Sequence, residues 1–234
     1  MPAERKSLAE AVARRYAPAG RFARHYARAK LLRDPVFFAL LEPGALPDSG
    51  TLVDLGCGQG LLLALLASSG QKPGLKLRGI ERDPSDVRRA RLALGGDAEI
   101  ELGDLRSTAL PRARVIALVD VIHYLEPPDQ EELLARVAEA LEDDGVLLLR
   151  VCDAHAGLRA WLTRAGDHLG VLTRRGRVGR LHLRGADEWR ALLERLGLES
   201  GGVPMNQGTP FANVLFRARK AARIRSAERG VVGA

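Results

Sequence analysis

Acidic residues and glycines gather at the ends of hydrophobic segments in this 234-residue chain. The segment 51–55 runs directly into Gly56-Cys57-Gly58-Gln59-Gly60. Glycines at such a point let the backbone approach a ligand closely. Four successive hydrophobic segments each end in an acidic residue, and these are Asp54, Glu81, Asp104 and Asp120. Carboxylates accept hydrogen bonds and balance positive charge, so the pattern predicts a binding site for a polar ligand with a cationic group.

The spacing of the glycines narrows the choice of ligand. A dinucleotide-binding fingerprint needs a third glycine at its sixth position, which is Leu61 here. A phosphate-binding P-loop needs a lysine followed by serine or threonine, and the segment contains neither. Asp54 would repel a pyrophosphate and would suit an ammonium group. The loop therefore favours S-adenosylmethionine as the cofactor.

The elements that position these residues alternate between strand and helix. Strands are predicted over 51–55, 75–81, 98–102, 115–120 and 146–151, with two further candidates over 198–205 and 213–219. Helices are predicted over 60–68, 84–94, 128–141, 156–168 and 186–196. This alternation requires parallel pairing, with helices on both faces of the sheet. The expected fold is therefore an α/β, Rossmann-like, doubly wound sheet with its ligands at the carboxyl ends of the strands.

The N-terminal segment has a different composition. Residues 3–33 are rich in Ala, Arg and Leu and are divided by Pro18–Gly20. The stretch 21–33 places Phe22 and Tyr26 at helical spacing, and this apolar stripe predicts packing on the main domain. We therefore expect a helical cap or lid over 1–48, a catalytic domain over 49–220 and a basic tail over 221–234.

The motifs VDLGCGQG, GIERD, GDL and LVDVIHYL resemble, in this order, those of class I S-adenosylmethionine-dependent methyltransferases. The resemblance covers residues 51–151 closely and implies a seven-stranded sheet, mostly parallel, with an antiparallel last strand. It places Glu81 at the ribose, Asp104 and Leu105 at the adenine, and Asp120 beside the sulfonium and the acceptor. It places Asp54, Gly56, Gly58 and Gly60 at the methionine end, and Cys57 and Arg82 complete the predicted cofactor-binding set.

The fourth strand leads into the residues with the best chemistry for catalysis. His123 follows this strand, and a histidine pKa near neutrality suits a general base. Tyr124 would cover the methionine moiety or shape the pocket. Asp153 and His155 follow the fifth strand at the same edge and are further candidates. A packing role is the alternative for each of these four residues.

A narrower resemblance concerns both ends of the chain. The segments RFARHYARAKL, DPVF and GTPFANVL are similar to parts of bacterial methyltransferases that accompany aryl-polyene or xanthomonadin-like pigment synthesis. This resemblance implies a small-molecule acceptor that is aromatic or polyketide-like, held free or on an acyl carrier protein. It places Thr209, Phe211 and Asn213 at the border of the acceptor pocket.

Three other functions remain open, and the distribution of charge bears on the first of them. Residues 1–33 carry +7 and residues 217–234 carry +5, against +7 for the whole chain. The segment 171–184 holds five arginines and no acidic residue, which would suit an RNA or ribosomal methyltransferase. Aromatic residues for base stacking are sparse at 4%. A non-catalytic module that binds the cofactor is the third possibility, and an α/β domain for another nucleotide is a fourth.

Composition excludes several classes of protein. The two cysteines, Cys57 and Cys152, cannot form a disulfide framework or a four-cysteine zinc site. The five histidines are scattered, so no metal is expected. The longest apolar run, 61–67, is too short for a membrane span, and no secretory signal is recognisable at the N-terminus. We therefore expect a cytoplasmic protein, and the oligomeric state is open.

Overall fold

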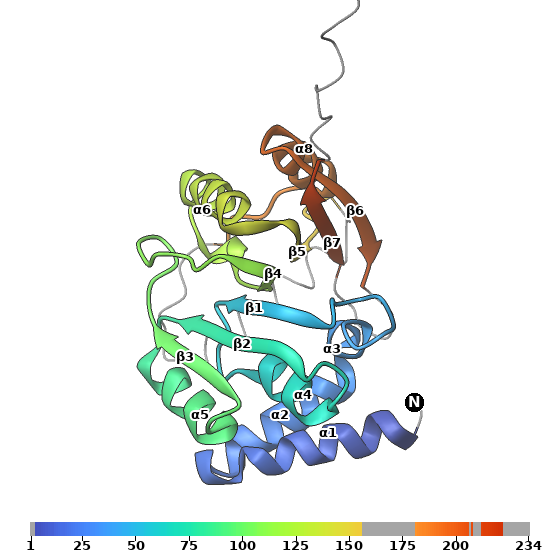
Figure 1. The fold of residues 1–234 in the computed structure, drawn as a ribbon, viewed down its shortest axis with the longest axis vertical. Coiled ribbons are helices and arrows are strands. Elements are labelled where there is room, and N and C mark those ends of the chain that lie inside the picture. Colours follow the sequence, from blue (N-terminus) through green and yellow to red (C-terminus); the bar gives the residue numbers. More distant parts are fainter. Residues whose placement is uncertain (1–2, 156–180, 206, 208–211, 222–234) are drawn as a thin grey trace, which may run out of the picture.

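The hydrophobic segments form one seven-stranded sheet (Figure 1). The computed structural model describes residues 3–155, 181–205, 207 and 212–221. The strands are β1 (Ser49–Leu55), β2 (Gly74–Glu81), β3 (Ala98–Leu102), β4 (Ala113–Val119), β5 (Leu141–Cys152), β6 (Leu198–Pro204) and β7 (Asn213–Lys220). Their order across the sheet is β3-β2-β1-β4-β5-β7-β6, and β7 runs antiparallel to both of its neighbours. The predicted Rossmann-like sheet with an antiparallel last strand is confirmed.

Strand β5 differs most from its prediction, because it begins at Leu141 rather than at Val146. Leu141 pairs with Ala113, and the next pair joins Val146 to Val115. The register therefore shifts across Asp144 and Gly145, which precede the predicted strand 146–151. Extra residues on one strand of a pair are accommodated as a bulge, and the strand continues beyond it.

Helices cover both faces of the sheet (Figure 1). They are α1 (Ala3–Arg15), α2 (Arg21–Arg33), α3 (Pro35–Ala39), α4 (Leu61–Ser69), α5 (Pro84–Leu94), α6 (Pro127–Ala140) and α8 (Ala186–Arg195), with short 3-10 turns η1 (Ala17–Ala19) and η2 (Ile122–Tyr124). Helices α1 to α5 share one hydrophobic cluster with the sheet, and α6 and α8 share the other. Burial on both faces explains why the parallel strands are almost continuously apolar.

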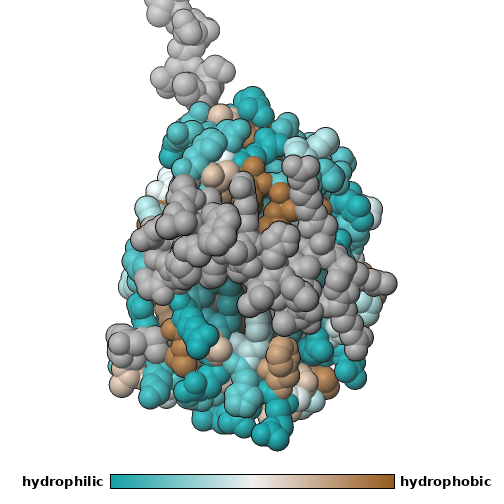
Figure 2. Space-filling view, turned by 180° about the vertical axis from the view of Figure 1, so that it is seen from behind, coloured by the Kyte–Doolittle hydropathy of each residue, from teal (hydrophilic) through white to brown (hydrophobic). Residues whose placement is uncertain are grey.

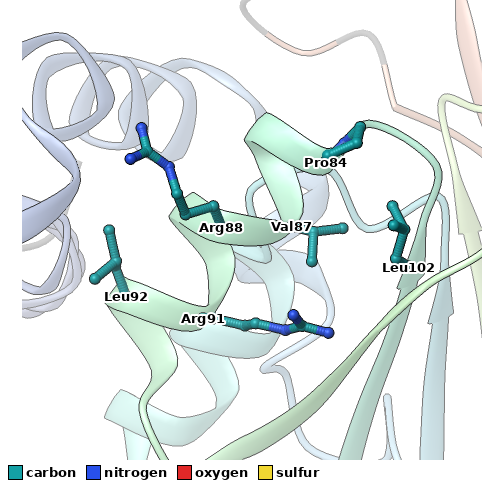
Figure 3. A pocket seen from close by; sticks show the side chains of 6 residues that line it. All are labelled: Pro84, Val87, Arg88, Arg91, Leu92 and Leu102. Atoms are coloured by element: carbon teal, nitrogen blue, oxygen red, sulfur yellow. The ribbon is translucent and has the colours of Figure 1, made fainter.

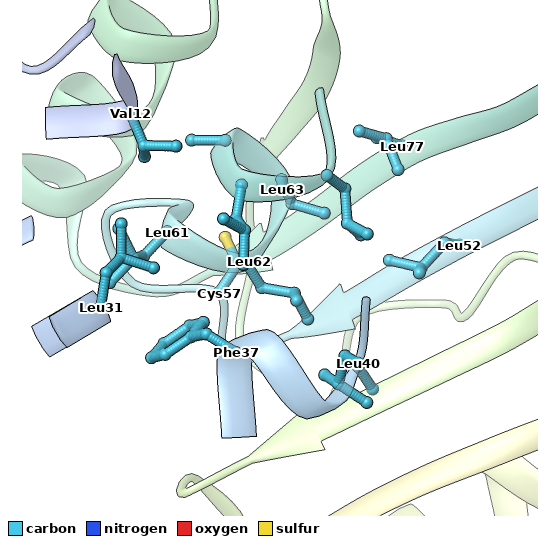
Figure 4. Packing of buried hydrophobic residues seen from close by; sticks show 14 of the residues in the cluster. Val12, Leu31, Phe37, Leu40, Leu52, Cys57, Leu61, Leu62, Leu63 and Leu77 are labelled. Carbon is cyan, nitrogen blue, oxygen red and sulfur yellow. The ribbon is translucent and has the colours of Figure 1, made fainter. Parts of the chain in front are cut away.

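The N-terminal helices pack against the helix that follows the glycine loop (Figure 4). Val12 of α1, Leu31 of α2 and Phe37 of α3 lie in one cluster with Leu61 and Leu62 of α4. The predicted packing of this segment on the main domain is therefore seen. The domain limits stay a prediction, and residues 222–234 of the predicted tail lie outside the described residues.

The surface and the helix lengths bear on membrane association. In the part of the chain that the structure describes, each helix is too short or too polar to serve as a membrane span. Among the described residues that are visible in Figure 2, hydrophilic ones predominate, with smaller hydrophobic areas between them. The cytoplasmic location stays a prediction.

Candidate active site

The glycine loop turns sharply between β1 and α4. Gly56, Gly58 and Gly60 all have positive φ angles, of 72°, 54° and 74°. The backbone N–H groups of Gly56 and Cys57 donate to the carbonyl of Ile80 at 2.8 and 3.1 Å. A Cβ atom on Gly56 would collide with the side chain of Val121, just after β4. The loop therefore needs glycine both for its conformation and for its close approach to the neighbouring strand end.

Glu81 ties the ends of three strands together. Its Oε2 accepts from the Gly58 N–H at 3.0 Å, and its Oε1 accepts from the N–H groups of Arg82 and Asp83 at 2.8 and 2.9 Å. The Glu81 carbonyl accepts from the Gly103 N–H at 3.0 Å. An ionised carboxylate offers about four acceptor positions, so these three bonds leave it capacity for a ribose hydroxyl.

Asp54 is buried at the end of β1, with 4% of its surface exposed. Burial, and then the charge of Glu81, raise the pKa of its carboxyl to about 7. Space is open beside the loop, because no atom lies within 4 Å of the position of a Cβ on Gly58. A cation placed there would favour the ionised form of Asp54. These residues therefore fit a ligand with an ammonium or sulfonium group, as S-adenosylmethionine has.

The other two residues of the predicted loop set have different surroundings. Cys57 is buried, its pKa is raised by that burial, and its Sγ atom lies where a Cβ on Gly79 would be. Its thiol therefore packs between β2 and the loop. Arg82 is exposed, and its backbone N–H holds Glu81.

The predicted adenine end lies after β3. The guanidinium of Arg106 donates to both carboxylate oxygens of Asp104, and this holds the pKa of Asp104 at about 2. Leu105 is buried, and its carbonyl accepts from Arg136. Arg106 therefore competes for the carboxylate that was predicted to receive the adenine amino group, and the adenine role of Asp104 stays a prediction.

Four charged side chains meet where β4 and β5 end, and we call them the four-charge cluster: Lys30, Asp34, Asp120 and Arg150. Nη1 of Arg150 donates to Oδ2 of Asp34 at 2.7 Å and to Oδ2 of Asp120 at 3.0 Å. Nζ of Lys30 lies 2.8 Å from Asp34 and 3.6 Å from Asp120. Burial favours the neutral carboxyl of Asp34, but Lys30 and Arg150 outweigh it and lower the Asp34 pKa.

Asp120 was predicted from the sequence, but its three partners in this cluster were not. Arg150 is a single charge in the apolar run of β5, and it is 1% exposed. A charge within a buried strand requires a partner, which was the available signal. Asp34 was not among the predicted site residues. Its Oδ1 does accept from the Val36 N–H and begins α3, while its Oδ2 reaches Arg150.

His123 lies next to this cluster, in η2, and is 4% exposed. Burial lowers the pKa of its imidazole; Asp120 opposes this effect and Arg150 adds to it. Neither ring nitrogen has a hydrogen-bond partner in the described part of the chain. A buried polar group without a partner is rare and points to a functional role. The lowered pKa keeps the His123 imidazole neutral near pH 7, and its role as a general base stays a prediction.

The remaining catalytic candidates have other contacts. The Tyr124 ring packs on the His123 ring with their centroids 4.5 Å apart. Oδ1 of Asp153 accepts from the N–H groups of His155 and Ala186 at 3.0 and 3.2 Å, so it holds the start of α8. The His155 side chain is 73% exposed. Among the predicted bases, His123 has the surroundings that best suit proton transfer.

The family follows from a comparison with known proteins. A family profile described as a methyltransferase domain matches residues 22–200, which is most of the chain. The chain belongs to this methyltransferase-domain family. The resemblance of the four motifs to class I S-adenosylmethionine-dependent methyltransferases is confirmed. The narrower resemblance to pigment-associated methyltransferases stays a prediction.

Relatives of this methyltransferase-family chain include curated proteins and solved structures. It is 30% identical over 113 residues to the carboxy-S-adenosyl-L-methionine synthase of Klebsiella pneumoniae (strain 342), covering 44% of this chain and 46% of that protein. The chain thus spans about half the length of the curated relatives it matches. It superposes on mitomycin 7-O-methyltransferase MmcR with a TM-score of 0.66 and 27% identity, over 87% of this chain and 58% of that one. The chain also superposes on CalO1, a methyltransferase of calicheamicin biosynthesis that was solved with S-adenosylhomocysteine bound. The TM-score is 0.60 and the sequence identity is 25%, over 85% of this chain and 57% of CalO1.

A groove outside the predicted site lies between α5 and the edge strand β3 (Figure 3). Its volume is about 310 Å³, and its lining residues are Pro84, Val87, Arg88, Arg91, Leu92 and Leu102. None of them belongs to the predicted site of this family member. Three or more His, Cys, Asp or Glu side chains do not gather as metal ligands among the described residues. The expected lack of a metal stays a prediction.

Several predicted residues are outside the described part of the methyltransferase-family chain. These are Thr209, Phe211 and most of the arginines of the segment 171–184. Asn213 is described and is buried at the start of β7. Arg184 is also described, and its guanidinium donates to Gln130 and Glu131. Its charge therefore already has partners within the protein.

Proposed function

We propose that this chain transfers a methyl group from S-adenosylmethionine to a hydroxyl oxygen of a small aromatic or polyketide-like acceptor. The observation that carries this proposal is the His123 imidazole, which is buried, held neutral and without a hydrogen-bond partner in the described residues. The likeness to O-methyltransferase MmcR supports the same chemistry.

The cofactor end supports the choice of donor. When bound, S-adenosylmethionine supplies a methyl group on a positively charged sulfur. The glycine loop leaves room for its methionine end, and the carboxyl of Asp54 balances positive charge there. Glu81 accepts from a ribose hydroxyl with the acceptor position that its three backbone bonds leave free.

His123 performs the proton transfer in this proposal. An alcohol or phenol becomes a better nucleophile as its proton leaves, so a base beside the hydroxyl speeds the reaction. The imidazole accepts that proton on a ring nitrogen, and Asp120 stabilises the imidazolium that forms. Tyr124, whose ring packs against the imidazole at an interplanar angle of 58°, restricts its orientation. Positioning of the hydroxyl contributes the rest of the rate, because geometry dominates a direct displacement.

Charge balance supports a neutral acceptor. The four-charge cluster contains two cations and two carboxylates, and each cation is bonded to a carboxylate. An anionic acceptor would therefore find no unmatched positive charge in this cluster. Synthesis of carboxy-S-adenosylmethionine, the activity in the name of the curated relatives, is the second candidate, favoured by the 30% identity to the Klebsiella pneumoniae protein.

We also propose that the acceptor is free or carried by an acyl carrier protein. The charge of +7 over residues 1–33 would attract an acidic carrier. Part of this net charge is balanced by acidic residues outside the segment, because Arg15 pairs with Asp97 and Lys30 pairs with Asp34. The carrier therefore has to bind through the remaining basic residues of this segment.

The test uses S-adenosylmethionine with an isotopically labelled methyl group. The purified protein is mixed with phenols and enols, both free and linked to a carrier protein, and products are identified by mass spectrometry. Methyl ethers of these hydroxyls are expected. Label in RNA, formation of carboxy-S-adenosylmethionine, or cofactor binding without any product would each replace the proposal with one of the alternatives.

The role of His123 has its own variant. His123→Gln is expected to lower kcat by roughly 10²- to 10⁴-fold, the usual contribution of a general base. Affinity for S-adenosylhomocysteine, measured by calorimetry, should change little. The matched control is His155→Gln, since His155 is exposed at the same sheet edge and should retain its turnover. Full activity of the His123 variant would remove the base from the mechanism.

A further inference from the structure

Arg150 joins two parts of the chain that are far apart in sequence. It comes from β5 and is 1% exposed. Its Nη1 atom holds Asp34, 116 residues earlier, and Asp120, 30 residues earlier. Asp34 lies between α2 and α3 of the N-terminal segment, whereas Asp120 follows β4. One guanidinium nitrogen thus connects the helical cap to the acceptor end of the sheet.

Asp120 has a backbone that needs such support. Its φ angle is +58°, the only positive value at a non-glycine position among the described residues. Its N–H donates to the Arg150 carbonyl at 3.2 Å, and its side chain accepts from the same residue. The left-handed conformation is unfavourable for residues with a Cβ, so it persists only where neighbours fix it. The turn that it starts leads into η2 and His123.

We propose that Arg150 is a positioning residue for this reaction, which fastens the helical cap, through Asp34, to the turn that carries His123. This inference rests on the proposed function, in which His123 is the base. Arg150 is fully enclosed, so it acts through Asp120 and touches neither cofactor nor acceptor.

Among the described residues, charged and titratable groups from several elements lie against His123. His182 is one of them, because its backbone N–H donates to the His123 carbonyl at 2.9 Å, while its side chain pairs with Glu126. Asp120 lies at the end of β4, Arg150 in β5, and Tyr124 beside His123 in η2. Lys30 of α2 reaches the same Asp120 carboxylate. Removal of the Arg150 guanidinium takes away a positive charge and leaves Asp120 less neutralised. Both changes favour the imidazolium form of His123.

The first experiment measures the titration of His123 by NMR, with His123→Gln to assign its signal. In Arg150→Met, the pKa of His123 is expected to rise by about one pH unit, the effect of a nearby charge. Turnover should fall by about tenfold or more through lost positioning. The Kd for S-adenosylhomocysteine should stay within about threefold, because the glycine loop is intact.

A matched pair of variants separates positioning from simple attachment of the cap. Asp34→Asn weakens the link to Arg150, whereas Asp97→Asn breaks the Arg15–Asp97 ion pair, another bond between the N-terminal helices and the body. Asp34→Asn is expected to shift the His123 resonances and to lower kcat by about threefold or more. Asp97→Asn should do neither.

These experiments test the positioning role of Arg150 independently of the proposed methyl transfer. If Arg150→Met does not fold, Arg150→Lys keeps a charge and is expected to give a smaller change of the same sign. An unmoved His123 titration in these variants, or equal effects of Asp34→Asn and Asp97→Asn, would overturn the positioning role. Because the NMR measurement needs no acceptor, it can succeed even if hydroxyl methylation fails.

Discussion

The two ends of the candidate site are built in different ways. The cofactor end is made of consecutive residues, where a glycine turn follows β1 and is held by backbone bonds to Ile80 and Glu81. The predicted acceptor end is held by the four-charge cluster, whose side chains come from four separate places in the sequence. Local backbone geometry controls the first end, and long-range ion pairing controls the second.

This difference determines how each end should respond to substitution. A backbone-built loop tolerates changes of surface side chains but not the addition of a Cβ atom where φ is positive. A buried charge cluster tolerates backbone variation but not the loss of one partner, which leaves an uncompensated charge. The two ends also touch, because Gly56 packs against Val121, the residue after Asp120.

The largest effect is expected at the cofactor end, from Gly56→Ala. Alanine would be forced into a left-handed conformation and would collide with Val121. We expect a loss of roughly 2–5 kcal/mol of stability from these two causes together, and loss of measurable S-adenosylhomocysteine binding. Thermal unfolding and calorimetry measure the two effects.

The matched control for this substitution is Gly70→Ala, which ends α4. Gly70 also has a positive φ, of 64°, but no atom lies within 4 Å of the added Cβ. Only the conformational part should remain, about 1–2 kcal/mol, with cofactor binding retained. Equal losses in the two variants would mean that the contact with Val121 is unimportant, and the two ends of the site would then be independent.

The contrast between local backbone geometry and long-range ion pairing also explains which features could be predicted from the sequence. The glycine loop and the parallel strands were predicted because their signals are short-range: closely spaced glycines and continuous apolar runs. The number of strands and the antiparallel β7 came from the family resemblance rather than from the residues. The contact between Asp34 and Arg150 spans 116 positions, and spacing along a sequence does not encode such a pair.

The start of β5 was misplaced for a related reason. Asp144-Gly145 is a good turn signal by itself, but pairing of Leu141 with Ala113 extends the strand past it. Tertiary pairing here overrides a local preference. His123 was found because its position after a predicted strand is a local feature, whereas its lack of a partner was visible only in the structure.

A smaller change in the free energy of unfolding is expected from Asp54→Asn, which tests a buried charge at the cofactor end. The pKa of Asp54 is about 7 in the folded protein and that of an unfolded aspartate is about 3.9. Because the unfolded chain releases this proton more easily, Asp54 destabilises the ligand-free fold increasingly as pH rises from about 4 to 7. Asparagine removes this penalty, so the variant should gain roughly 1–3 kcal/mol at pH 8.

Binding should change in the opposite direction. The ligand ammonium favours ionised Asp54, so wild-type affinity for S-adenosylhomocysteine should rise with pH, by up to about tenfold per pH unit, and level off above pH 7. Asp54→Asn should weaken binding by about tenfold at pH 8 and remove this rise. Calorimetry from pH 5.5 to 8.5 measures both, and a flat wild-type profile would show that Asp54 does not balance the ligand charge.

The smallest effect is expected from Tyr16→Phe, which tests whether the helical cap also supports the cofactor end. The hydroxyl of Tyr16, in the turn after α1, donates to the Gln59 carbonyl in the glycine loop at 2.9 Å, and this contact is buried. Phenylalanine keeps the packing and removes one hydrogen bond, so about 1 kcal/mol of stability should be lost. If the loop is held mainly by its own backbone bonds, affinity for S-adenosylhomocysteine should fall by less than about threefold. A tenfold loss of affinity would mean that the cap positions both ends of the site. The glycine loop would then depend on a side chain 43 residues away, just as the acceptor end depends on Asp34.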